Sequence, residues 1–460
     1  MKSVSESPRQ RSTSRLVLLF CLWKAILLTL AAFCPGPGYD TSGLILLDTS
    51  VQRHSHFNAS TRFERFVLNL LRWDALYFVK SAERGLIHEQ AWAFSGVYSR
   101  FLGITVQSVV SGSVTPPLHY YVLAGIIVSN ACHLISVLVL HRLLTLVLEP
   151  QRQKTIPFVA AILHVLTPAS LFMCAPYAEA IFSLLNFTGM LLYAQSRTIA
   201  RSTAFSIQED IQKVGAGLFF AAATLMRSNG LFSGTILLYD VVRYLFALAS
   251  TQRSIHDVRR TLVTCISGGL IAVAFIGPQY LAYTEFCNGE SSAPIRPWCE
   301  KRLPSIYSWV QSHYWNVGLF RYWTVSNLPL FVLAAPTLWL LFTSSVTLLC
   351  SCAGDLLPRT PASGTSVTQD TGSAICKLPE LALPQLLLAI LAVTTFHVQI
   401  VNRIASGYPV WYLMVATWVV DSQGLSSTKN RSSWAQWFVR GMVVYSLVQG
   451  VLYANFLPPA

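Results

Sequence analysis

The chain of 460 residues is 53% hydrophobic and only 12% charged, and its mean hydropathy is +0.50. A soluble domain carries roughly 25% charged residues, so this composition leaves too little polar surface for a globule in water. The formal net charge of +13 does not indicate nucleic-acid binding. The basic residues lie in short loops between apolar runs, which is the positive-inside pattern of membrane proteins.

Apolar runs of about 20 residues, the length that crosses a bilayer core, predict an all-α polytopic membrane protein with about eleven transmembrane helices in a single domain, residues 1–460. The first run contains Lys24 and is longer than the apolar part of a signal peptide, so we expect an anchor that is retained. The runs that meet at Arg227 and at Ser406–Gly407 are short, as in re-entrant or strongly tilted segments. The expected spans are residues 16–34, 117–144, 155–174, 178–195, 213–226, 229–249, 262–284, 327–349, 381–402, 408–421 and 437–457.

The basic residues also predict the orientation of the chain. With the N-terminus in the cytosol, they fall in alternate, cytosolic loops, near residues 152–154, 197–213, 253–260 and 429–431.

Three long hydrophilic segments separate the spans. Residues 35–116 and 285–326 form loops on the non-cytosolic side, whereas the Ser-, Thr-, Gly- and Pro-rich stretch 350–380 is a flexible cytosolic linker. Cys287 and Cys299 share the second loop and could form a disulfide if that loop faces an oxidising lumen.

The first long loop contains an acid on the apolar face of a predicted helix. Apolar residues recur at helical spacing over residues 63–78, and Asp74 lies on the same stripe. A carboxylate there costs free energy unless it is paired or its pKa is raised, which is how a general base is tuned towards neutrality. Asp74 is therefore a candidate base, and the alternative is a structural acid paired with Arg72 or another arginine. Farther along, His88 and Glu89 lie beside aromatic residues and either contact a sugar or belong to an exposed loop.

Two further charged residues lie at membrane edges on the same side. Glu179 begins an apolar run with no cation nearby in the sequence, so it is a candidate site residue, although a helix dipole would also stabilise it. Arg227 opposes the positive-inside rule and needs an anion to compensate it. That anion is either a substrate phosphate or a structural acid such as Glu179 or Asp74.

The remaining candidates come from later segments. Arg321 lies among aromatic residues just before a span, and His397 and Gln399 lie within the end of an apolar helix. Acids and arginines on one side of the membrane, with aromatic residues around them, suit an anionic phosphate donor and a hydroxyl acceptor. These loops lack a paired-acid DxD motif, so a metal-held nucleotide sugar is not indicated. The candidates on this side are Asp74, Glu179, Arg227, Arg321, His397, Gln399 and Arg403.

Five motifs, in this order, carry a resemblance to a known family. They are Arg72-Trp73-Asp74-Ala75 with Glu89-Gln90-Ala91-Trp92-Ala93-Phe94; Pro168-Ala169-Ser170 with Tyr177 and Glu179; Arg227-Ser228-Asn229-Gly230; Asn316-Val317-Gly318 with Phe320-Arg321-Tyr322-Trp323; and His397-Val398-Gln399 with Arg403. In them the sequence resembles the second GPI mannosyltransferase family of the endoplasmic reticulum, in a fungal-like version. It departs from the family after Phe94, where Ser95-Gly96-Val97 follows without a proline, and in the stretch 350–380.

The resemblance implies a GT-C glycosyltransferase fold in the membrane of the endoplasmic reticulum. It implies transfer of the second, α-1,6-linked mannose of the GPI core from dolichyl-phosphate-mannose to the GPI precursor on the lumenal side, with inversion. Asp74 would be the general base and Arg72 and Trp73 would orient it and the sugar. Arg227, Arg321 or Arg403 would bind the donor phosphate.

The other substrate-binding residues that we predict are Glu89, Glu179, Asn229, His397 and Gln399. No cofactor or metal is expected besides the lipid-linked donor. The expected partners are the two lipid substrates, with room for a small accessory membrane subunit and no nucleic acid.

Three alternatives remain open at this point. One is another dolichol-phosphate-sugar transferase of the same architecture, which the set of motifs disfavours. Another is a lipid or sugar transporter, but the spans are nearly free of acids and no internal repeat is found. The third is a non-catalytic subunit of a membrane complex, which would not need Asp74.

Overall fold

The computed structural model of this chain describes residues 8–35, 38–42, 62–110, 116–249, 254–288, 296–351, 376–421 and 429–457. Within these ranges the regular elements are all helices, which confirms the predicted all-α class. They are α1 (Pro8–Phe33), α3 (Arg62–Leu70), α4 (Asp74–Arg84), η1 (Glu89–Ala93), α5 (Gly96–Val109), α6 (Leu118–Val147), α7 (Ile156–Val165), η2 (Ser170–Met173), α8 (Glu179–Ser202), α9 (Ile207–Met226), η3 (Ser228–Ser233), α10 (Gly234–Ala249), α11 (Ile255–Cys287), α12 (Ile306–His313), η4 (Val325–Asn327), α13 (Leu328–Ser351), η5 (Pro379–Ala382), α15 (Leu383–Thr394), η6 (Val398–Ile400), α16 (Val401–Ile404), η7 (Ala405–Gly407), α17 (Val410–Asp421) and α18 (Lys429–Ala454).

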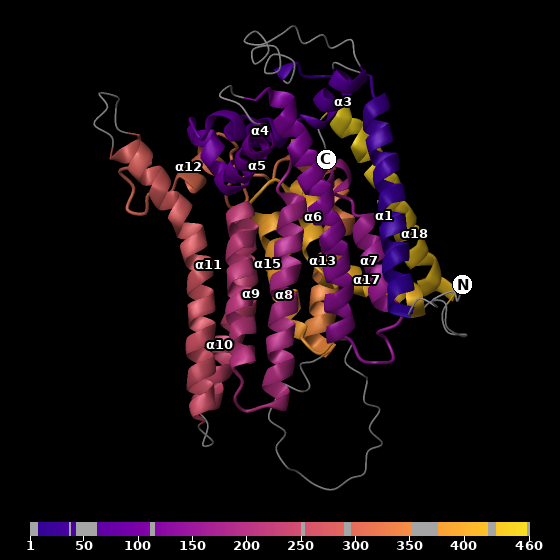
Figure 1. Cartoon of the computed structure of the whole chain (residues 1–460), viewed down its shortest axis with the longest axis vertical. Coiled ribbons are helices and arrows are strands. Elements are labelled where there is room, and N and C mark those ends of the chain that lie inside the picture. Colours follow the sequence, from indigo (N-terminus) through magenta and orange to yellow (C-terminus); the bar gives the residue numbers. More distant parts are fainter. Residues whose placement is uncertain are drawn as a thin grey trace.

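Six of the described helical segments are long and apolar enough to cross a bilayer. They are Ser12–Phe33, Leu118–Val147, Ser228–Ala249, Ile255–Cys287, Val325–Ser351 and Trp434–Ala454. The helices α7, α15 and α17 are apolar but shorter, and α8 and α9 run beside the longer ones (Figure 1). The chain is therefore a polytopic membrane protein, and the count of about eleven spans stays a prediction.

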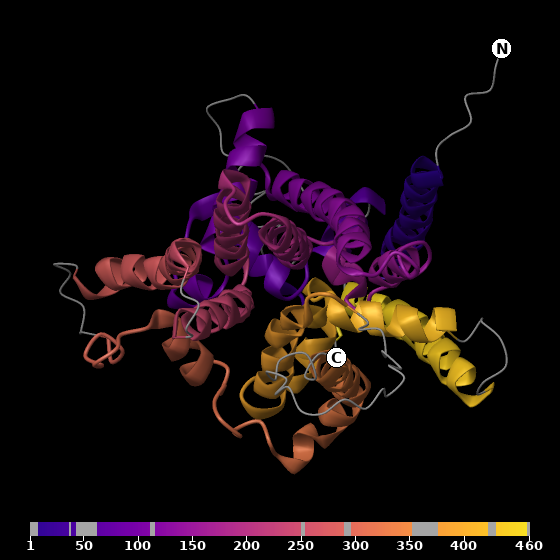
Figure 2. The same cartoon turned by 90° about the horizontal axis from the view of Figure 1, so that it is seen from below.

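The short helices of both long loops gather at one end of the bundle. Figure 1 shows α3, α4, α5 and α12 together at its top, which we call the upper end. Seen from below, the magenta helices α6–α9 form one side of the bundle and the orange and yellow helices α13–α18 the other (Figure 2). Residues at the upper ends of these two groups can therefore meet beneath the loop helices.

The predicted continuous helix over residues 63–78 is wrong, because the chain breaks between α3 and α4. Trp73 has φ 54°, a left-handed conformation that strains a bulky residue. Backbone carbonyls that the break frees accept hydrogen bonds from two tyrosines that are remote in the sequence, Tyr177 before α8 and Tyr453 in α18. The Tyr177 hydroxyl donates to the Arg72 carbonyl at 3.0 Å, and that of Tyr453 donates to the Leu70 carbonyl at 3.1 Å. As a result Asp74 begins α4 instead of lying in mid-helix.

A second break separates α7 from α8, so the predicted span 155–174 is an α-helix only as far as Val165. Side chains from three other helices bind the exposed carbonyls. Lys24 donates to the Met173 carbonyl at 2.8 Å, Ser129 to that of Ala175 at 2.7 Å, and Ser446 to that of Thr167 at 2.9 Å. Backbone groups inside a membrane need such partners. The break delivers Glu179 to the upper end as the first residue of α8.

Candidate active site

Four of the predicted site residues meet at the upper end of the bundle in one network of ion pairs. Asp74 begins α4, Glu179 begins α8, Arg227 follows α9 and Arg403 lies in α16. The four residues are far apart in the sequence, and the breaks in the helices bring their side chains together. We call them the upper network.

Arg403 holds the two acids of the upper network together. Its Nη1 lies 2.9 Å from Asp74 Oδ2, and its Nε lies 2.8 Å from Glu179 Oε1. The guanidinium also stacks over the rings of Phe172 and Tyr177, at 5.0 and 5.6 Å from their centroids. A planar guanidinium can hold two carboxylates and an aromatic face at once, which a lysine cannot do.

Glu179 is the buried acid of the upper network, and we call such an acid closed. Its side chain is 1% exposed, and its Oε1 accepts a hydrogen bond from Arg227 Nη1 at 2.6 Å besides the contact with Arg403. The N-terminus of α8 stabilises its negative charge further. The sequence left open whether a substrate phosphate or a structural acid compensates Arg227. In the structure the acid Glu179 pairs with it.

Asp74 is the open acid of the upper network. Its side chain is 28% exposed, whereas that of Arg403 is 14% exposed. One carboxylate oxygen is held by Arg403, and Asp74 is the first residue of α4. A carboxylate that is oriented on one side and accessible on the other can receive a proton from a bound hydroxyl group.

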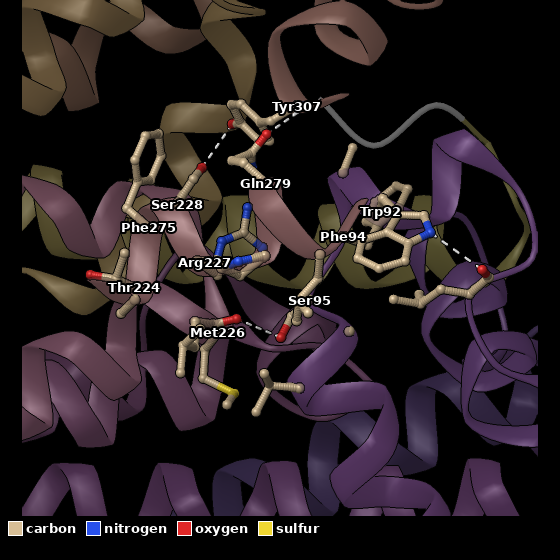
Figure 3. Close-up of a pocket in the computed structure, with 18 of the residues that line it drawn as sticks. Trp92, Phe94, Ser95, Thr224, Met226, Arg227, Ser228, Phe275, Gln279 and Tyr307 are labelled. Atoms are coloured by element: carbon tan, nitrogen blue, oxygen red, sulfur yellow. Dashed lines mark hydrogen bonds between the residues drawn. The ribbon is translucent and has the colours of Figure 1, made fainter. Parts of the chain in front are cut away.

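A pocket adjoins the network at Arg227 (Figure 3). Its empty space, counting the part that is open, is about 770 Å³. Ser95 donates to the Leu225 carbonyl at 2.7 Å, and the hydroxyls of Ser228 and Tyr307 share a hydrogen bond of 2.7 Å at its edge. Asp74 does not line this pocket, so Arg227 is the residue that links the two.

Arg72 and Trp73, the two residues before α4, are held by contacts with other parts of the protein. Arg72 is fully buried, donates to Asn69 Oδ1 at 3.0 Å and stacks over Phe456 at 5.0 Å. Burial lowers the pKa of its guanidinium to about 10. The Trp73 ring meets Phe456 edge-on at 4.9 Å. Both side chains fix the backbone that leads into Asp74.

Glu89, which we predicted to bind substrate, is held by side chains of the second long loop. Its side chain is 7% exposed and accepts hydrogen bonds from Arg296 Nη1 at 2.7 Å, Trp298 Nε1 at 2.9 Å, Trp309 Nε1 at 3.1 Å and Tyr314 OH at 3.3 Å. Burial opposes its ionisation, but these hydrogen bonds outweigh burial and hold the pKa of Glu89 below its usual value.

These contacts of Glu89 fasten the second long loop onto the first. A disulfide between Cys287 and Cys299 closes the start of the second loop. The pairing that the sequence left open is therefore present.

The other predicted residues lie apart from the upper network. Asn229 Nδ2 donates to the Tyr408 hydroxyl at 3.0 Å. His397 Nε2 lies 2.9 Å from the Trp315 carbonyl, and Gln399 Oε1 accepts from the Tyr322 hydroxyl at 3.1 Å.

Arg321 is exposed and makes no ion pair with another described residue. Of the three arginines predicted to bind phosphate, Arg227 and Arg403 thus belong to the upper network through ion pairs, and Arg321 does not.

Sequence reasoning missed Arg100 and Tyr307, which line the pocket. Arg100 belongs to α5 and has no sequence feature that distinguishes it from an ordinary surface arginine. Tyr307 belongs to the second long loop, whose packing on the first cannot be predicted from local pattern.

Comparisons with known proteins agree with the sequence motifs. The family model described as "Mannosyltransferase (PIG-V)" matches residues 13–460. A protein named GPI mannosyltransferase 2 from Aspergillus oryzae is 39% identical, over 97% of this chain and 95% of that one. Its namesake from Aspergillus fumigatus is 39% identical over 99% and 95%, and that from Schizosaccharomyces pombe is 26% identical over 92% and 79%.

A solved structure also resembles the chain. The archaeal oligosaccharyltransferase AglB from Archaeoglobus fulgidus aligns with a TM-score of 0.43 and 13% identity, over 97% of this chain and 56% of that one. A likeness of this size adds nothing to the assignment of the fold.

Proposed function

Because this chain belongs to the mannosyltransferase family described as PIG-V, we propose that it adds the second, α-1,6-linked mannose to the GPI-anchor precursor. The donor in this proposal is dolichyl-phosphate-mannose. The name shared by the curated relatives supports the acceptor, since the relatives are similar to this chain over nearly its whole length. The GT-C architecture stays part of the proposal.

The observation that carries the proposed chemistry is the open carboxylate of Asp74 within the upper network. Asp74 takes the proton from the acceptor hydroxyl as that oxygen bonds to the anomeric carbon of mannose. The bond between the anomeric carbon and the phosphate oxygen breaks, and dolichyl phosphate leaves with the electron pair. A single displacement of this kind inverts the anomeric carbon. One base suffices, because the phosphate leaving group needs little help from an acid.

Arginines of the network stabilise the leaving group. Negative charge grows on the phosphate as the bond breaks, and a fixed guanidinium stabilises that charge more than it stabilises the bound donor. Arg227 lines the pocket and still has its Nε buried without a hydrogen-bond partner among the described residues. Arg403, which already contacts two acids, mainly orients Asp74.

We propose that the reaction needs no metal ion. In support, both acids of the network already have arginine partners. The four charges of the upper network, two acids and two arginines, balance one another without a cation.

The proposed location is the endoplasmic reticulum membrane, with the N-terminus in the cytosol and the upper end in the lumen. The distribution of basic loops supports this orientation. A small accessory membrane subunit is compatible with it.

The test is complementation of cells that lack the second GPI mannosyltransferase, with lipid-linked intermediates as the readout. We expect the one-mannose GPI lipid to accumulate in these cells and to be cleared by this chain. Microsomes supplied with dolichyl-phosphate-mannose should then form the two-mannose lipid. Clearance of a different dolichol-dependent intermediate would indicate another sugar transferase. No effect on any intermediate would support a transporter or a non-catalytic subunit.

A further inference from the structure

The pocket beside Arg227 is lined by basic residues and by no acidic one. Two arginines line it, Arg100 from α5 and Arg227 from the end of α9, and none of its lining residues is Asp or Glu. Arg227 donates to Glu179, and so belongs to the balanced upper network. Arg100 is exposed and makes no hydrogen bond or ion pair with another described residue. The pocket therefore carries about one uncompensated positive charge.

One wall of the pocket is apolar and continues onto a surface that faces the bilayer. Phe275, Pro278 and Leu281 of α11 line it, and α11 is long and apolar enough to cross a membrane. Leu281 is 52% exposed although it lines the pocket. On the opposite wall Val97 of α5 is 38% exposed. An apolar chain can therefore leave the pocket between α5 and α11 without entering water.

Figure 3 shows how the polar groups of the pocket are arranged around Arg227. Ser228 and Tyr307 lie above it and are hydrogen-bonded to each other, and Gln279 accepts a hydrogen bond from the Tyr307 backbone. Trp92 and Phe94 lie to the other side. Hydroxyl groups and aromatic faces beside an arginine suit a phosphate that carries a sugar.

From this geometry we infer that the pocket binds the donor's isoprenyl phosphate, with the phosphate between Arg100 and Arg227 and the lipid chain leaving past Val97 and Leu281. A phosphodiester carries one negative charge, which matches the one uncompensated cation. The inference rests on the proposed function, because it takes the lipid-linked sugar as substrate. It adds Arg100 as a residue that binds the donor phosphate, and it specifies how the donor lipid is oriented in the pocket. The mannosyl group then lies on the side of Arg227 that leads through Glu179 and Arg403 to Asp74.

The inference predicts which kinetic constant Arg100 controls. In purified full-length protein, Arg100→Gln should raise the KM for dolichyl-phosphate-mannose roughly tenfold, because a charge-assisted hydrogen bond is lost. The kcat and the KM for the GPI precursor should stay within about twofold, since neither the base nor its partners change. Arg100→Lys should recover part of the donor affinity, because a charge remains near the phosphate.

Arg84→Gln is the matched control. Arg84 ends α4 at the same end of the bundle, is exposed, does not line the pocket and makes no ion pair with another described residue. We expect this variant to behave like the wild type. Loss of donor affinity in both variants would mean that general surface charge, and not the pocket, attracts the lipid.

A binding measurement separates failure of the inference from failure of the proposed function. Radiolabelled dolichyl phosphate, which carries no sugar, should bind the wild type and bind Arg100→Gln roughly tenfold more weakly. Dolichyl phosphate could bind in this way although the wild type transfers no mannose to the GPI precursor. The pocket would then still be a site for isoprenyl phosphate, and the proposed acceptor would be wrong. If Arg100→Gln changes only the KM for the GPI precursor, or if phosphatidylinositol displaces the label, the pocket holds the acceptor lipid and the inference is overturned. An unchanged affinity for every lipid also overturns it.

Discussion

Two clusters of buried charges lie towards opposite ends of the bundle. They differ in which side chain is the most exposed to solvent. The lower cluster centres on Asp240, which binds Lys213 and lies 3.3 Å from both Arg197 and Arg243. Arg197 also lies 3.5 Å from Glu380. Arg197 is 18 residues along α8 from Glu179, or about 27 Å at the rise of an α-helix.

In the lower cluster both acids are closed. The side chains of Asp240 and Glu380 are 0% and 2% exposed, and the most open member is Arg243 at 38%. In the upper network the most open member is Asp74, and Arg227 lines a pocket. A network of buried ion pairs therefore does not by itself indicate chemistry. What distinguishes the upper network is an accessible carboxylate, Asp74, together with an arginine that lines a pocket.

Replacing the open acid should have the largest effect. We expect Asp74→Asn to lower mannose transfer about 10³-fold, because the amide cannot accept the proton from the acceptor hydroxyl. The amide still fits beside Arg403, so the amount of protein and its melting temperature should change little. The measurement is turnover per folded molecule with the donor and the GPI precursor. Near-normal turnover would remove Asp74 from the role of base.

The same change in the lower cluster should affect stability and not catalysis. Asp240→Asn leaves buried cations without their acid, which we expect to lower the free energy of unfolding by about 3 kcal/mol. Thermal unfolding in detergent measures the loss. Turnover per folded molecule should stay within about twofold of the wild type. A stable Asp240→Asn protein without activity would show that the comparison between open and closed acids does not identify the site.

Glu89 offers a third carboxylate, closed like Asp240 but outside the membrane-spanning helices. Because its pKa is lowered in the folded protein, its ionised form adds stability that is complete above its usual pKa of about 4.5 and is lost as the pH falls through the lower folded value. We expect Glu89→Gln to cost about 2 kcal/mol at pH 7. The difference in stability between this variant and the wild type should shrink as the pH falls below about 4.5. A deficit that does not depend on pH would mean that shape, not charge, fastens the two loops.

Sequence patterns could single out the residues of the upper network, but they could not predict how the backbone brings these residues together. Asp74, Glu179, Arg227 and Arg403 are recognisable because a charged residue at the edge of an apolar run is unusual. The break before Asp74 is not recognisable, since neither glycine nor proline marks residues 71–73. It exists because Tyr177 and Tyr453, remote in sequence, cap the freed carbonyls.

Glu89 shows that the contacts of a predicted site residue cannot be read from its neighbours in the sequence. An acid beside aromatic residues suits a sugar site, and the sequence contains no local sign of its donors. Arg296, Trp298 and Trp309 lie more than 200 residues away. Arg100 was missed because nothing about it is unusual until α9 and α11 close a pocket against it.

The last prediction concerns orientation and should leave activity unchanged. The C-terminal end of α18 lies at the upper end of the bundle, since the Tyr453 hydroxyl donates a hydrogen bond to the carbonyl of Leu70, the last residue of α3. Its start at Lys429 is 24 residues away, or about 36 Å. The glycosylation sequon at Asn430 therefore lies at the lower end of the bundle. The sequon at Asn58 lies outside the described residues and belongs to the first long loop, which the sequence predicts to be lumenal.

We expect a glycan on Asn58 and none on Asn430, read as a gel shift that Asn58→Gln abolishes while turnover is retained. This outcome would put the open acid in the lumen, where a base for the proposed lipid-linked substrates is needed. A glycan on Asn430 alone would reverse the orientation. The closed lower cluster would then face the lumen and Asp74 the cytosol. The proposed reaction would in that case lack an accessible base on the side where its acceptor lies.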